Sequence, residues 1–342
     1  MAAINRRKSP TQLDVARVAG VSRTTVSYVL NHNTEIAIPD DTRQRVWNAI
    51  AELGYVPNRA ARSLRTHRTY TIAGIIQDIT NPFHPAFERG IQDVAERYGY
   101  DLIMYNTDGQ RARELKALQS IQQGRADGVV GIFFHIRPDD LDPLVESGIP
   151  VVWLHGGRCE TSATHAYDRL LVDNAGGAQA AVAHLVERGH RHIALLAGEG
   201  PPSADRLQGY RQGLAAAGLP FDSALVLASR FTIEDGQRLT LSLLERSPRP
   251  TAIFASSDML ALGAYMAARD TGLRIPDDLA VVGFDDIVTA RLVTPPLTTV
   301  RLPQRGLGQR AAEMLFERLE GQASGPGRCE EQPFEFVVRG ST

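Results

Sequence analysis

The stretch TQLDVARVAGVSRTTVSYVLNHNTEIAIPDDTRQRVWNAIAELGYVPNRAARSLR, residues 11–65, decides how the N-terminal part of this chain folds. Thr11, with an acidic residue three positions later, has the pattern of a side chain that caps the start of a helix. Gly20 follows that helix and permits the left-handed backbone that a tight turn often needs. Ser22 can then cap a second helix over residues 23–31. The pattern predicts two short helices joined by a glycine turn.

Apolar residues recur at helical spacing around this turn and predict one buried face. The residues on that face are Val15, Ala19, Val21, Val26 and Val29. A third helix, from about Asp41 to Leu53, has a similar apolar face and can close a small core. The outward face of the second helix is polar, and its side chains are long enough to reach base edges or phosphates in DNA. A plain helical hairpin with a solvated polar face is the alternative.

The charge of the chain is divided unevenly. Residues 1–68 contain eleven Lys or Arg and five Asp or Glu, whereas the remainder contains 26 and 34. The overall balance of −2 therefore combines a basic N-terminal part, at +6, with an acidic remainder, at −8. A basic region of this kind is typical of proteins that bind polyanions, so we expect contact with DNA to be confined to it.

A short basic segment follows the third helix. Pro57-Asn58 has the form of a helix start, with Asn58 as the cap, and residues 59–64 span about two turns. Isolated helices of this length are marginally stable in water. We therefore expect the segment to be loose without DNA and to fold when it binds; a plain linker is the alternative.

The body of the chain, from about Tyr70 to the end, alternates strand-like apolar runs with helix-length stretches. The first runs are TIAGIIQD, DLIMYNT, DGVVGIFF and PVVWLH; a similar series after Val172 contains HIALLAG, ALVLAS, AIFASS and LAVVGFD. Buried parallel strands have sequences of this kind, with helices covering both faces of the sheet. The alternation predicts an α/β body of two doubly wound parallel-sheet lobes, with ligands bound at the carboxyl ends of the strands.

Seven motifs spread over nearly the whole chain resemble the LacI/GalR family of bacterial transcription regulators. They are DVARVAGVSRTTVSYVLN, ELGYVPNRAARSL, NPFHPAFERGI, HLVERGHRHIALLAG, SSDMLALGAY, VVGFDD and PPLTTVR. The resemblance implies an all-α helix-turn-helix head, a hinge helix and a periplasmic-binding-protein-like body with a small-molecule effector between its lobes. It also implies a homodimer on a near-palindromic operator, and a chain that crosses between the lobes three times.

The resemblance implies which residues contact DNA. In the second helix they are Ser22, Arg23, Thr24, Thr25, Ser27, Tyr28 and Asn31, and in the segment after the third helix they are Asn58, Arg59, Ala61, Leu64 and Arg65. It implies that Leu64 of each protomer enters the minor groove at the operator centre and kinks the duplex; a packing leucine is the alternative. Many relatives carry arginine in place of Tyr28, and tyrosine cannot make the two hydrogen bonds that arginine makes to guanine.

The resemblance also implies which residues contact the effector or lie beside it. They are Asp78, Asn81, Phe83, Asp173, Arg206, Phe231, Ser257, Asp258 and Asp285. Carboxylates and a guanidinium can hydrogen-bond to neighbouring hydroxyl groups, and an aromatic ring can pack against the apolar face of a sugar. We expect a carbohydrate, with a nucleoside or purine as the alternative. Asp258 can instead cap a helix, and Arg206 can form an ion pair that closes the lobes. Either Asp285 or its neighbour Asp286 can cap the loop rather than bind.

Effector binding is expected to tilt the lobes, change the spacing of the hinge helices and so change operator affinity. The expected domains are residues 1–56 for the head, 57–68 for the hinge helix and linker, and 69–342 for the body. We expect lobe one at about 70–168 and 297–324, and lobe two at about 169–296 and 325–342. Dimer contacts are expected along two helices, at residues 83–98 and 258–270. The C-terminal stretch FEFVVRGST has no heptad repeat, so we do not expect a tetramer held together by a coiled-coil tail.

Other classes of protein fit the sequence less well. It has no GxSxG, GxxxxGK[ST] or HExxH motif, and GEGPP lacks the third glycine of a dinucleotide fingerprint, so we expect neither an enzyme nor a cofactor. His84, His135 and His155 lack metal-ligand spacing, and we expect no metal site. A secreted solute-binding protein would share the lobes but needs a signal segment, and MAAINRRKSP has no apolar core.

The cysteines and the hydropathy bear on the compartment. Cys159 and Cys329 lie 170 positions apart, and our expectation is a pair of free thiols in a reducing compartment. No apolar run is long enough to span a membrane, so we expect no membrane partner. Together with the family resemblance, these features predict a bacterial cytoplasmic protein associated with the nucleoid.

Overall fold

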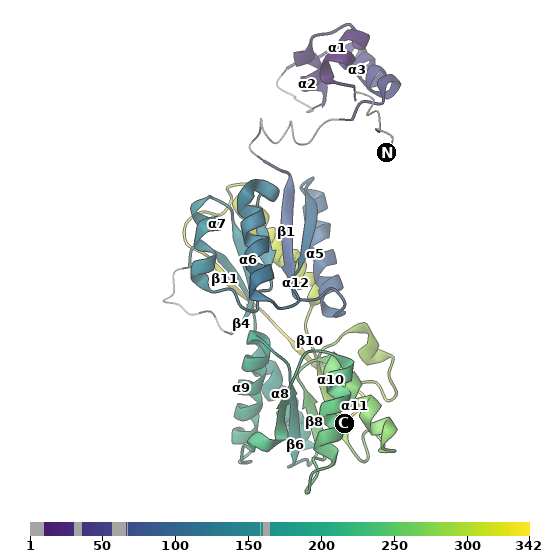
Figure 1. Ribbon diagram of the computed structural model, residues 1–342, viewed down its shortest axis with the longest axis vertical. Coiled ribbons are helices and arrows are strands. Elements are labelled where there is room, and N and C mark those ends of the chain that lie inside the picture. Colours follow the sequence, from purple (N-terminus) through teal and green to yellow (C-terminus); the bar gives the residue numbers. More distant parts are fainter. Residues whose placement is uncertain (1–9, 31–35, 57–65, 67, 158, 160–164) are drawn as a thin grey trace, which may run out of the picture. The chain divides into compact units, whose positions relative to one another are not determined.

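A computed structural model divides the chain into two compact units, Met1–Thr69 and Tyr70–Thr342, and each is described by itself (Figure 1). The structure describes residues 10–30, 36–56, 66, 68–157, 159 and 165–342. The expected hinge helix falls almost wholly outside the described residues, so its folding on DNA stays a prediction.

The first unit is built from three helices, α1 (Gln12–Ala19), α2 (Arg23–Leu30) and α3 (Asp40–Leu53). The predicted cap at the start of α1 is confirmed. The Asp14 backbone N–H donates to Thr11 Oγ1 at 3.4 Å, and the Thr11 N–H donates to the Asp14 carboxylate at 3.0 Å. The two contacts together form the reciprocal capping box that the sequence pattern predicts.

The turn between α1 and α2 also follows the prediction. Gly20 has a left-handed backbone with φ +66°, and the Thr25 N–H donates to Ser22 Oγ at 3.0 Å. Of the five residues predicted to be buried around this turn, Val21 alone is only half-buried. The core of the three helices consists of Val15, Ala16, Ala19, Val26, Val29, Val46, Ala49 and Tyr55.

The second unit contains two six-stranded sheets, which define two lobes (Figure 1). The first sheet has the order β11 (Cys329–Gln332), β5 (Asp168–Val172), β4 (Val151–Gly156), β3 (Val129–Gly131), β1 (Thr71–Ile76) and β2 (Asp101–Asn106). The second has the order β12 (Glu335–Val337), β10 (Thr298–Arg301), β9 (Ala280–Asp285), β8 (Ala252–Ala255), β6 (Ile193–Ala197) and β7 (Val226–Ala228). Among the described strands, every pair is parallel except β10–β12, so the predicted doubly wound architecture is confirmed.

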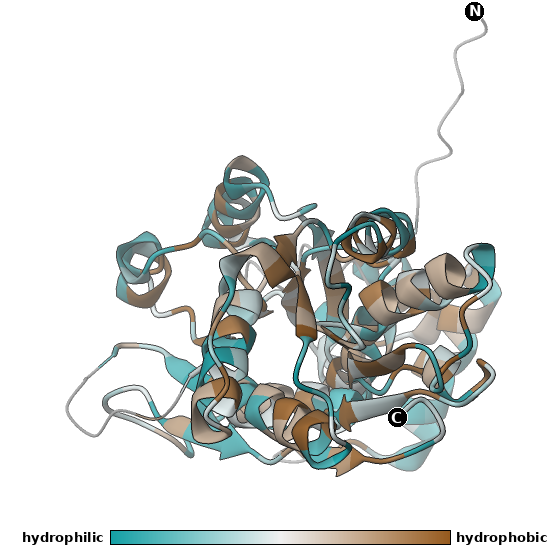
Figure 2. Ribbon diagram, turned by 90° about the horizontal axis from the view of Figure 1, so that it is seen from below, coloured by the Kyte–Doolittle hydropathy of each residue, from teal (hydrophilic) through white to brown (hydrophobic). Residues whose placement is uncertain are grey.

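Helices pack against these sheets, and hydrophobic strands lie between them (Figure 2). Lobe one carries α5 (Phe83–Arg97), α6 (Arg111–Ser120), α7 (Asp142–Glu146) and α12 (Gln304–Leu319). Lobe two carries α8 (Asn174–Glu187), α9 (Pro201–Ala216), α10 (Ile233–Leu244) and α11 (Asp258–Asp270). No helix in the described part of the chain is both long enough and apolar enough to cross a membrane.

Alternation along β1 shows that both faces of the first sheet are covered. Ile72 and Ile76 belong to the hydrophobic cluster that includes residues of α5 and α12, whereas Ala73 and Ile75 belong to the cluster that includes residues of α6 and α7. Side chains of a strand point alternately to opposite faces, so a strand covered on both faces is apolar throughout. This explains why TIAGII has no polar alternation.

Helix α12 returns to lobe one because two glycines let it approach α5 closely. A Cβ atom added to Gly308 would lie 2.0 Å from the Phe87 carbonyl oxygen, and one added to Gly90 would lie 2.1 Å from the Arg305 carbonyl oxygen. Any side chain at either position would force the two helices apart. The contact therefore fixes a late segment of the chain against an early one.

The lobe boundaries differ from those expected from the sequence. Strand β5 lies in the first sheet because it pairs with β4 and β11, and β10 lies in the second because it pairs with β9. The expected boundaries at residues 168, 297 and 325 therefore move to the ends of β5, β10 and β11, which places β11 in lobe one. The chain still crosses between the lobes three times, after β5, β10 and β11.

The expectation of free thiols is wrong. Cys159 and Cys329 form a disulfide, and the described residues include no free cysteine. Cys329 begins β11, which pairs beside β5, and Cys159 lies in the connection between β4 and β5, so the Cα atoms are 5.8 Å apart. That separation is in the range a disulfide requires. Sequence spacing could not show this proximity, because it depends on the sheet order.

Candidate functional site

The polar face of α2 carries the described residues predicted to contact DNA. Ser22, Arg23 and Thr24 are exposed, while Thr25, Ser27 and Tyr28 are half-buried. Val26 and Val29, on the opposite face, are buried in the core of the first unit. The helix is thus anchored on one side and presents a short polar surface on the other, as a recognition helix requires. Six further predicted residues lie outside the described residues: Asn31, Asn58, Arg59, Ala61, Leu64 and Arg65.

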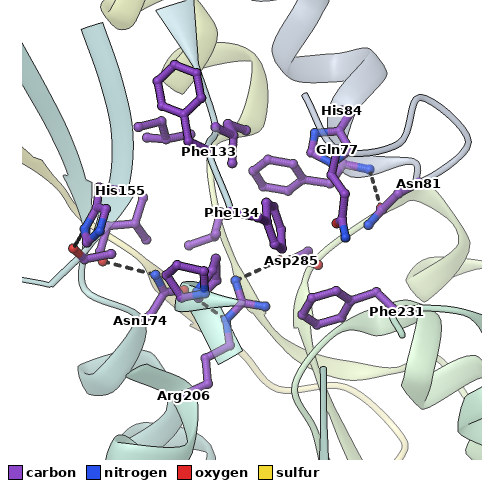
Figure 3. A pocket seen from close by; sticks show the side chains of 18 residues that line it. Gln77, Asn81, His84, Phe133, Phe134, His155, Asn174, Arg206, Phe231 and Asp285 are labelled. Atoms are coloured by element: carbon purple, nitrogen blue, oxygen red, sulfur yellow. Dashed lines mark hydrogen bonds and ion pairs between the residues drawn. The ribbon is translucent and has the colours of Figure 1, made fainter. Parts of the chain in front are cut away.

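A pocket that is partly open to solvent lies between the two lobes (Figure 3). Its lining residues follow or end the strands β1, β3, β4 and β5 of the first sheet and β6, β7, β9 and β10 of the second. This is the edge at which doubly wound sheets bind ligands. The lining consists of Gln77, Asn81, Phe83, His84, Ile132, Phe133, Phe134, Leu154, His155, Gly156, Val172, Asn174, Pro201, Pro202, Arg206, Phe231, Asp285 and Leu302.

Five of the nine predicted effector residues line this pocket: Asn81, Phe83, Arg206, Phe231 and Asp285. They come from both lobes, since the first two lie at the start of α5 and the other three belong to lobe two. In the view of Figure 3, the Phe134 ring lies above the end of the Arg206 side chain and the Phe231 ring lies to its right. The pocket has the usual composition of a small-molecule site, which is mostly apolar with a few convergent polar groups.

Arg206 is the centre of the polar part of the pocket. Its side chain is buried, and its Nε donates to Asn174 Oδ1 at 2.9 Å. Its Nη1 donates to the Ser256 carbonyl oxygen at 2.5 Å, and its Nη2 lies 3.4 Å from Asp285 Oδ1. The guanidinium also lies over the Phe284 ring, 3.7 Å from its centroid, in cation–π geometry. All of these partners belong to lobe two, so the ion pair does not join the lobes.

Asp285 and Asp286 have different environments, which separates their roles. Asp285 faces Arg206 and lines the pocket, and burial raises its pKa to about 6, although Arg206 acts in the opposite direction. Asp286 accepts hydrogen bonds from Arg301 at 2.6 Å and Arg339 at 2.6 Å, and these bonds outweigh burial and lower its pKa. Of the two aspartates, Asp285 is the one that lines the pocket.

The backbone at these two aspartates is unusual. Asp285 has φ +114° and Asp286 has φ +54°, a region that non-glycine residues rarely occupy. Two sets of contacts fix this conformation. Arginines hydrogen-bond to the Asp286 carboxylate, and the Gln304 side-chain amide donates to the Asp285 carbonyl oxygen. Strained backbone of this kind persists where surrounding contacts over-determine it, and it is common at ligand sites.

The remaining four predicted effector residues do not line the pocket. Asp258 is fully buried; it accepts from the Thr299 hydroxyl at 2.6 Å and from the Ile287 N–H at 2.8 Å, and burial raises its pKa. Ser257 caps α11 by accepting from the Leu260 N–H at 3.3 Å. Both side chains therefore make contacts within lobe two and do not line the pocket.

Asp173 and Asp78 are also engaged elsewhere. Asp173 caps α8 by accepting from the Gly176 N–H at 2.7 Å. Asp78 accepts from the Thr80 N–H at 2.9 Å and from its hydroxyl at 2.8 Å. Residues that follow strands do line the pocket, as the sequence predicted, but Asp, Asn and Ser at such positions can equally cap helices.

Several lining residues were missed from the sequence. The pairs Phe133-Phe134 and His155-Gly156 end or follow strands, so the rule that ligands bind at carboxyl ends could have found them. His84 could not be found in this way. It is 4% exposed, burial lowers its pKa to about 4, and its Nδ1 has no hydrogen-bond partner among the described residues.

Two family models match the chain. The model described as bacterial regulatory proteins of the lacI family matches residues 11–58, which include the three helices of the first unit. The model described as a periplasmic binding protein-like domain matches residues 182–342, which include most of lobe two. The two matches thus fall on the two structural units that carry the polar helix face and the pocket.

Relatives match nearly the full length of the chain. The HTH-type transcriptional regulator DegA of Bacillus subtilis (strain 168) is 36% identical over 341 residues, covering 97% of this chain and 98% of the relative. A transcriptional regulator CelR–cellobiose complex superposes with a TM-score of 0.72 at 33% identity, covering 97% and 100%. A lac repressor dimer bound to operator and the anti-inducer ONPF superposes with a TM-score of 0.83 at 27% identity, covering 98% and 99%. This chain belongs to the lacI family of bacterial regulatory proteins.

Proposed function

We propose that this protein is a repressor that binds a near-palindromic operator as a homodimer, and that a carbohydrate in the pocket between its lobes controls its operator affinity. The observation that carries the proposal is the convergence of Arg206, Asn174 and Asp285 among aromatic rings in a chain with a helix-turn-helix head. The protein acts by binding, in the cytoplasm of a bacterium, and no catalytic step is part of the proposal.

Helix α2 is the element that we propose to enter the major groove. The exposed side chains of Arg23 and Thr24 lie at its N-terminal end, which is the part of a recognition helix that meets base edges. Tyr28 lies one turn later and is half-buried, so it contacts a phosphate, a thymine methyl or a base edge without arginine's bidentate reading of guanine. The operator of this protein therefore differs from that of arginine-bearing relatives at one base pair in each half-site.

The pocket is suited to a polyhydroxylated ligand. Arg206 and Asp285 offer a donor and an acceptor side by side, which can engage neighbouring hydroxyl groups. The rings of Phe83, Phe134 and Phe231 offer apolar faces on which the C–H face of a sugar ring packs. The relative CelR binds cellobiose in its solved complex, which supports the same ligand class here.

Effector binding can control DNA binding if the two binding equilibria are thermodynamically coupled. The lining residues come from both lobes, so a bound effector has contacts that depend on the tilt between the lobes. If the tilt also sets the spacing of the two recognition helices in a dimer, effector and operator alter each other's affinity by one shared factor, commonly about 5–150-fold. An effector that lowers operator affinity is an inducer, and one that raises operator affinity is a corepressor.

The test begins with the operator. Full-length protein is used to select binding sites from random duplex DNA, and the recovered site is expected to be an inverted repeat. Operator affinity is then measured with and without cellobiose, ribose and inosine. A recovered inverted repeat whose affinity changes at least fivefold with one compound supports the proposal. Recovery of no sequence preference would contradict it.

A further inference from the structure

We infer that the pocket takes an uncharged, hydrogen-bonding molecule and that His84 is a residue that selects it. The inference rests on the proposed effector-binding role of the pocket and narrows the class of effector. It excludes phosphate esters and carboxylates, which a screen of metabolites would otherwise include. Three features of the described residues support it: the pairing of the lining charges, an acidic side chain behind the pocket wall, and the state of His84.

The first feature is that the lining charges already neutralise each other. Among the described residues that line the pocket, Arg206 and Asp285 are the only Arg, Lys, Asp or Glu. Their side chains are each 7% exposed and are joined at 3.4 Å. Proteins that bind phosphate or carboxylate groups supply arginine or lysine donors that are free to pair with them. Here the guanidinium donates to Asn174, Ser256 and Asp285 within lobe two, so an anionic ligand would have to compete with Asp285 for it.

The second feature is a further carboxylate close to the pocket wall. Asp205 Oδ2 is buried and has no hydrogen-bond partner among the described residues. It lies against Gly156, a lining residue, because a Cβ atom added to Gly156 would be 1.8 Å from it. Burial raises the pKa of Asp205, although His155 and Arg206 act in the opposite direction. In its ionised form, a carboxylate at this position disfavours an anion in the pocket.

The third feature is His84 itself, which has an unused polar atom at the pocket. The side chain is the second residue of α5 and is 4% exposed, and its Nδ1 lacks a partner in the described part of the chain. Burial holds its pKa at about 4, so the ring is neutral near pH 7 and has one donor and one acceptor nitrogen. Buried polar atoms nearly always have a hydrogen-bond partner. A buried polar atom without one in a ligand pocket therefore indicates that a ligand or a water molecule is its partner.

The start of α5 does not offer an alternative anion site. Helix N-termini attract anions because their first N–H groups are unsatisfied and the dipole is positive there. In this chain Asn81 occupies that position. Its side-chain oxygen accepts from the Phe83 N–H at 3.1 Å, and its backbone carbonyl accepts from the His84 N–H at 3.0 Å. Among the fully buried side-chain atoms of the described residues at this corner of the pocket, the one without a partner is the imidazole Nδ1 of His84.

These features describe a specific kind of ligand. It has hydroxyl or N–H groups that reach His84 in lobe one and the Arg206–Asp285 pair in lobe two. It has an apolar face for the ring of Phe231, and it carries no formal charge. Neutral sugars and neutral nucleosides share this chemistry, whereas their phosphate esters do not.

The test uses matched neutral and phosphorylated compounds. Full-length protein is titrated calorimetrically with glucose and glucose 6-phosphate, ribose and ribose 5-phosphate, cellobiose and its 6-phosphate ester, and inosine and inosine 5′-monophosphate. We expect at least one neutral compound to bind, and its phosphate ester to bind at least tenfold more weakly. A phosphate ester that binds as tightly as its neutral partner would overturn the inference, as would the failure of every neutral compound to bind.

Variants then isolate the role of His84. His84→Leu is expected to weaken the neutral ligand at least tenfold, and His84→Gln, which restores a neutral hydrogen-bonding group, to recover part of that loss. His135→Leu is the matched control, because His135 is exposed and does not line the pocket. Circular dichroism and operator affinity without ligand check that His84→Leu is folded. Equal ligand affinities for His84→Leu and the unmodified protein would overturn the assignment of His84.

The outcomes separate this inference from the proposed function. If a neutral compound binds in a His84-dependent manner but leaves operator affinity unchanged, the ligand class stands and the proposed control of DNA binding fails. If a phosphate ester changes operator affinity while its neutral partner does not, the proposed control stands and the inference about charge fails.

Discussion

Arg206 and Asp285 are 79 positions apart in the sequence, yet their side chains meet at 3.4 Å in the floor of the pocket, and each is 7% exposed. The carboxylate ends strand β9 and the guanidinium extends from α9, so the fold of lobe two alone brings them together. The pair presents a donor and an acceptor at one point while leaving the site without net charge. We expect this arrangement to contribute both to the stability of lobe two and to the choice of ligand.

Removing one partner of this pair should be costly. Arg206→Met leaves Asp285 buried without its counter-ion, and we expect a loss of about 3–5 kcal/mol in the free energy of unfolding. The double variant Arg206→Met with Asp285→Leu should recover most of that loss, because it removes both buried charges. Urea unfolding followed by circular dichroism measures the difference. A single variant as stable as the unmodified protein would show that the pair is not a buried ion pair in solution.

Protonation of His84 should couple stability to pH. The pKa of His84 is about 4 in the folded protein and about 6.5 in the unfolded chain, so the unfolded chain binds more protons between these values. The contribution of this group to stability is therefore complete above pH 6.5, and about 1.4 kcal/mol is lost for each unit the pH falls towards 4. His84→Leu should lack this component. Denaturant unfolding of both proteins at several pH values tests it, and parallel pH profiles would rule it out.

The disulfide should stabilise the second unit. It closes a loop with a sequence separation of 170, and cross-links that restrict the unfolded chain commonly contribute about 2–5 kcal/mol. Cys159→Ser and Cys329→Ser should each lower the unfolding temperature to the same extent, as should treatment with dithiothreitol. Thiol titration of the denatured protein should find no reactive thiol before reduction and two after it. Two thiols in freshly purified, unreduced protein would contradict the pairing.

Substitutions in α2 should separate base reading from backbone contact. Arg23→Ala should cost about 1–3 kcal/mol of discrimination at one base pair in each half-site and leave other positions unaffected. Tyr28→Arg should create a preference for guanine at the base pair that it faces. Binding-site selection with each variant provides the comparison. An equal loss on all DNA sequences would identify Arg23 as a phosphate contact instead.

Local patterns predicted much of the fold. The reciprocal cap between Thr11 and Asp14 and the left-handed Gly20 depend only on neighbouring residues, and both were predicted. Helix α3, predicted from about Asp41 to Leu53, spans Asp40–Leu53. The alternation of apolar runs and helical stretches predicted both sheets, since a strand buried on both faces leaves an unambiguous apolar signature.

Features that depend on contacts distant in sequence were not predictable in this way. Asp258 and Asp285 both lie at the ends of strands, and both were predicted to bind the ligand. The Asp258 carboxylate, however, accepts hydrogen bonds from Thr299 and Ile287 inside lobe two. The membership of β10 in the second sheet and the Cys159–Cys329 bond both depend on strand order. His84 became a candidate only when its burial and its unpaired nitrogen were known.

The most direct test of the central claim is a thermodynamic cycle between effector and operator. The dissociation constant of the effector is measured with and without saturating operator, and that of the operator with and without saturating effector. The account predicts one shared factor, of about 5–150, in both comparisons. Identical effector affinities with and without operator would show that the pocket and the DNA-binding head are not coupled, and would contradict the proposed regulation.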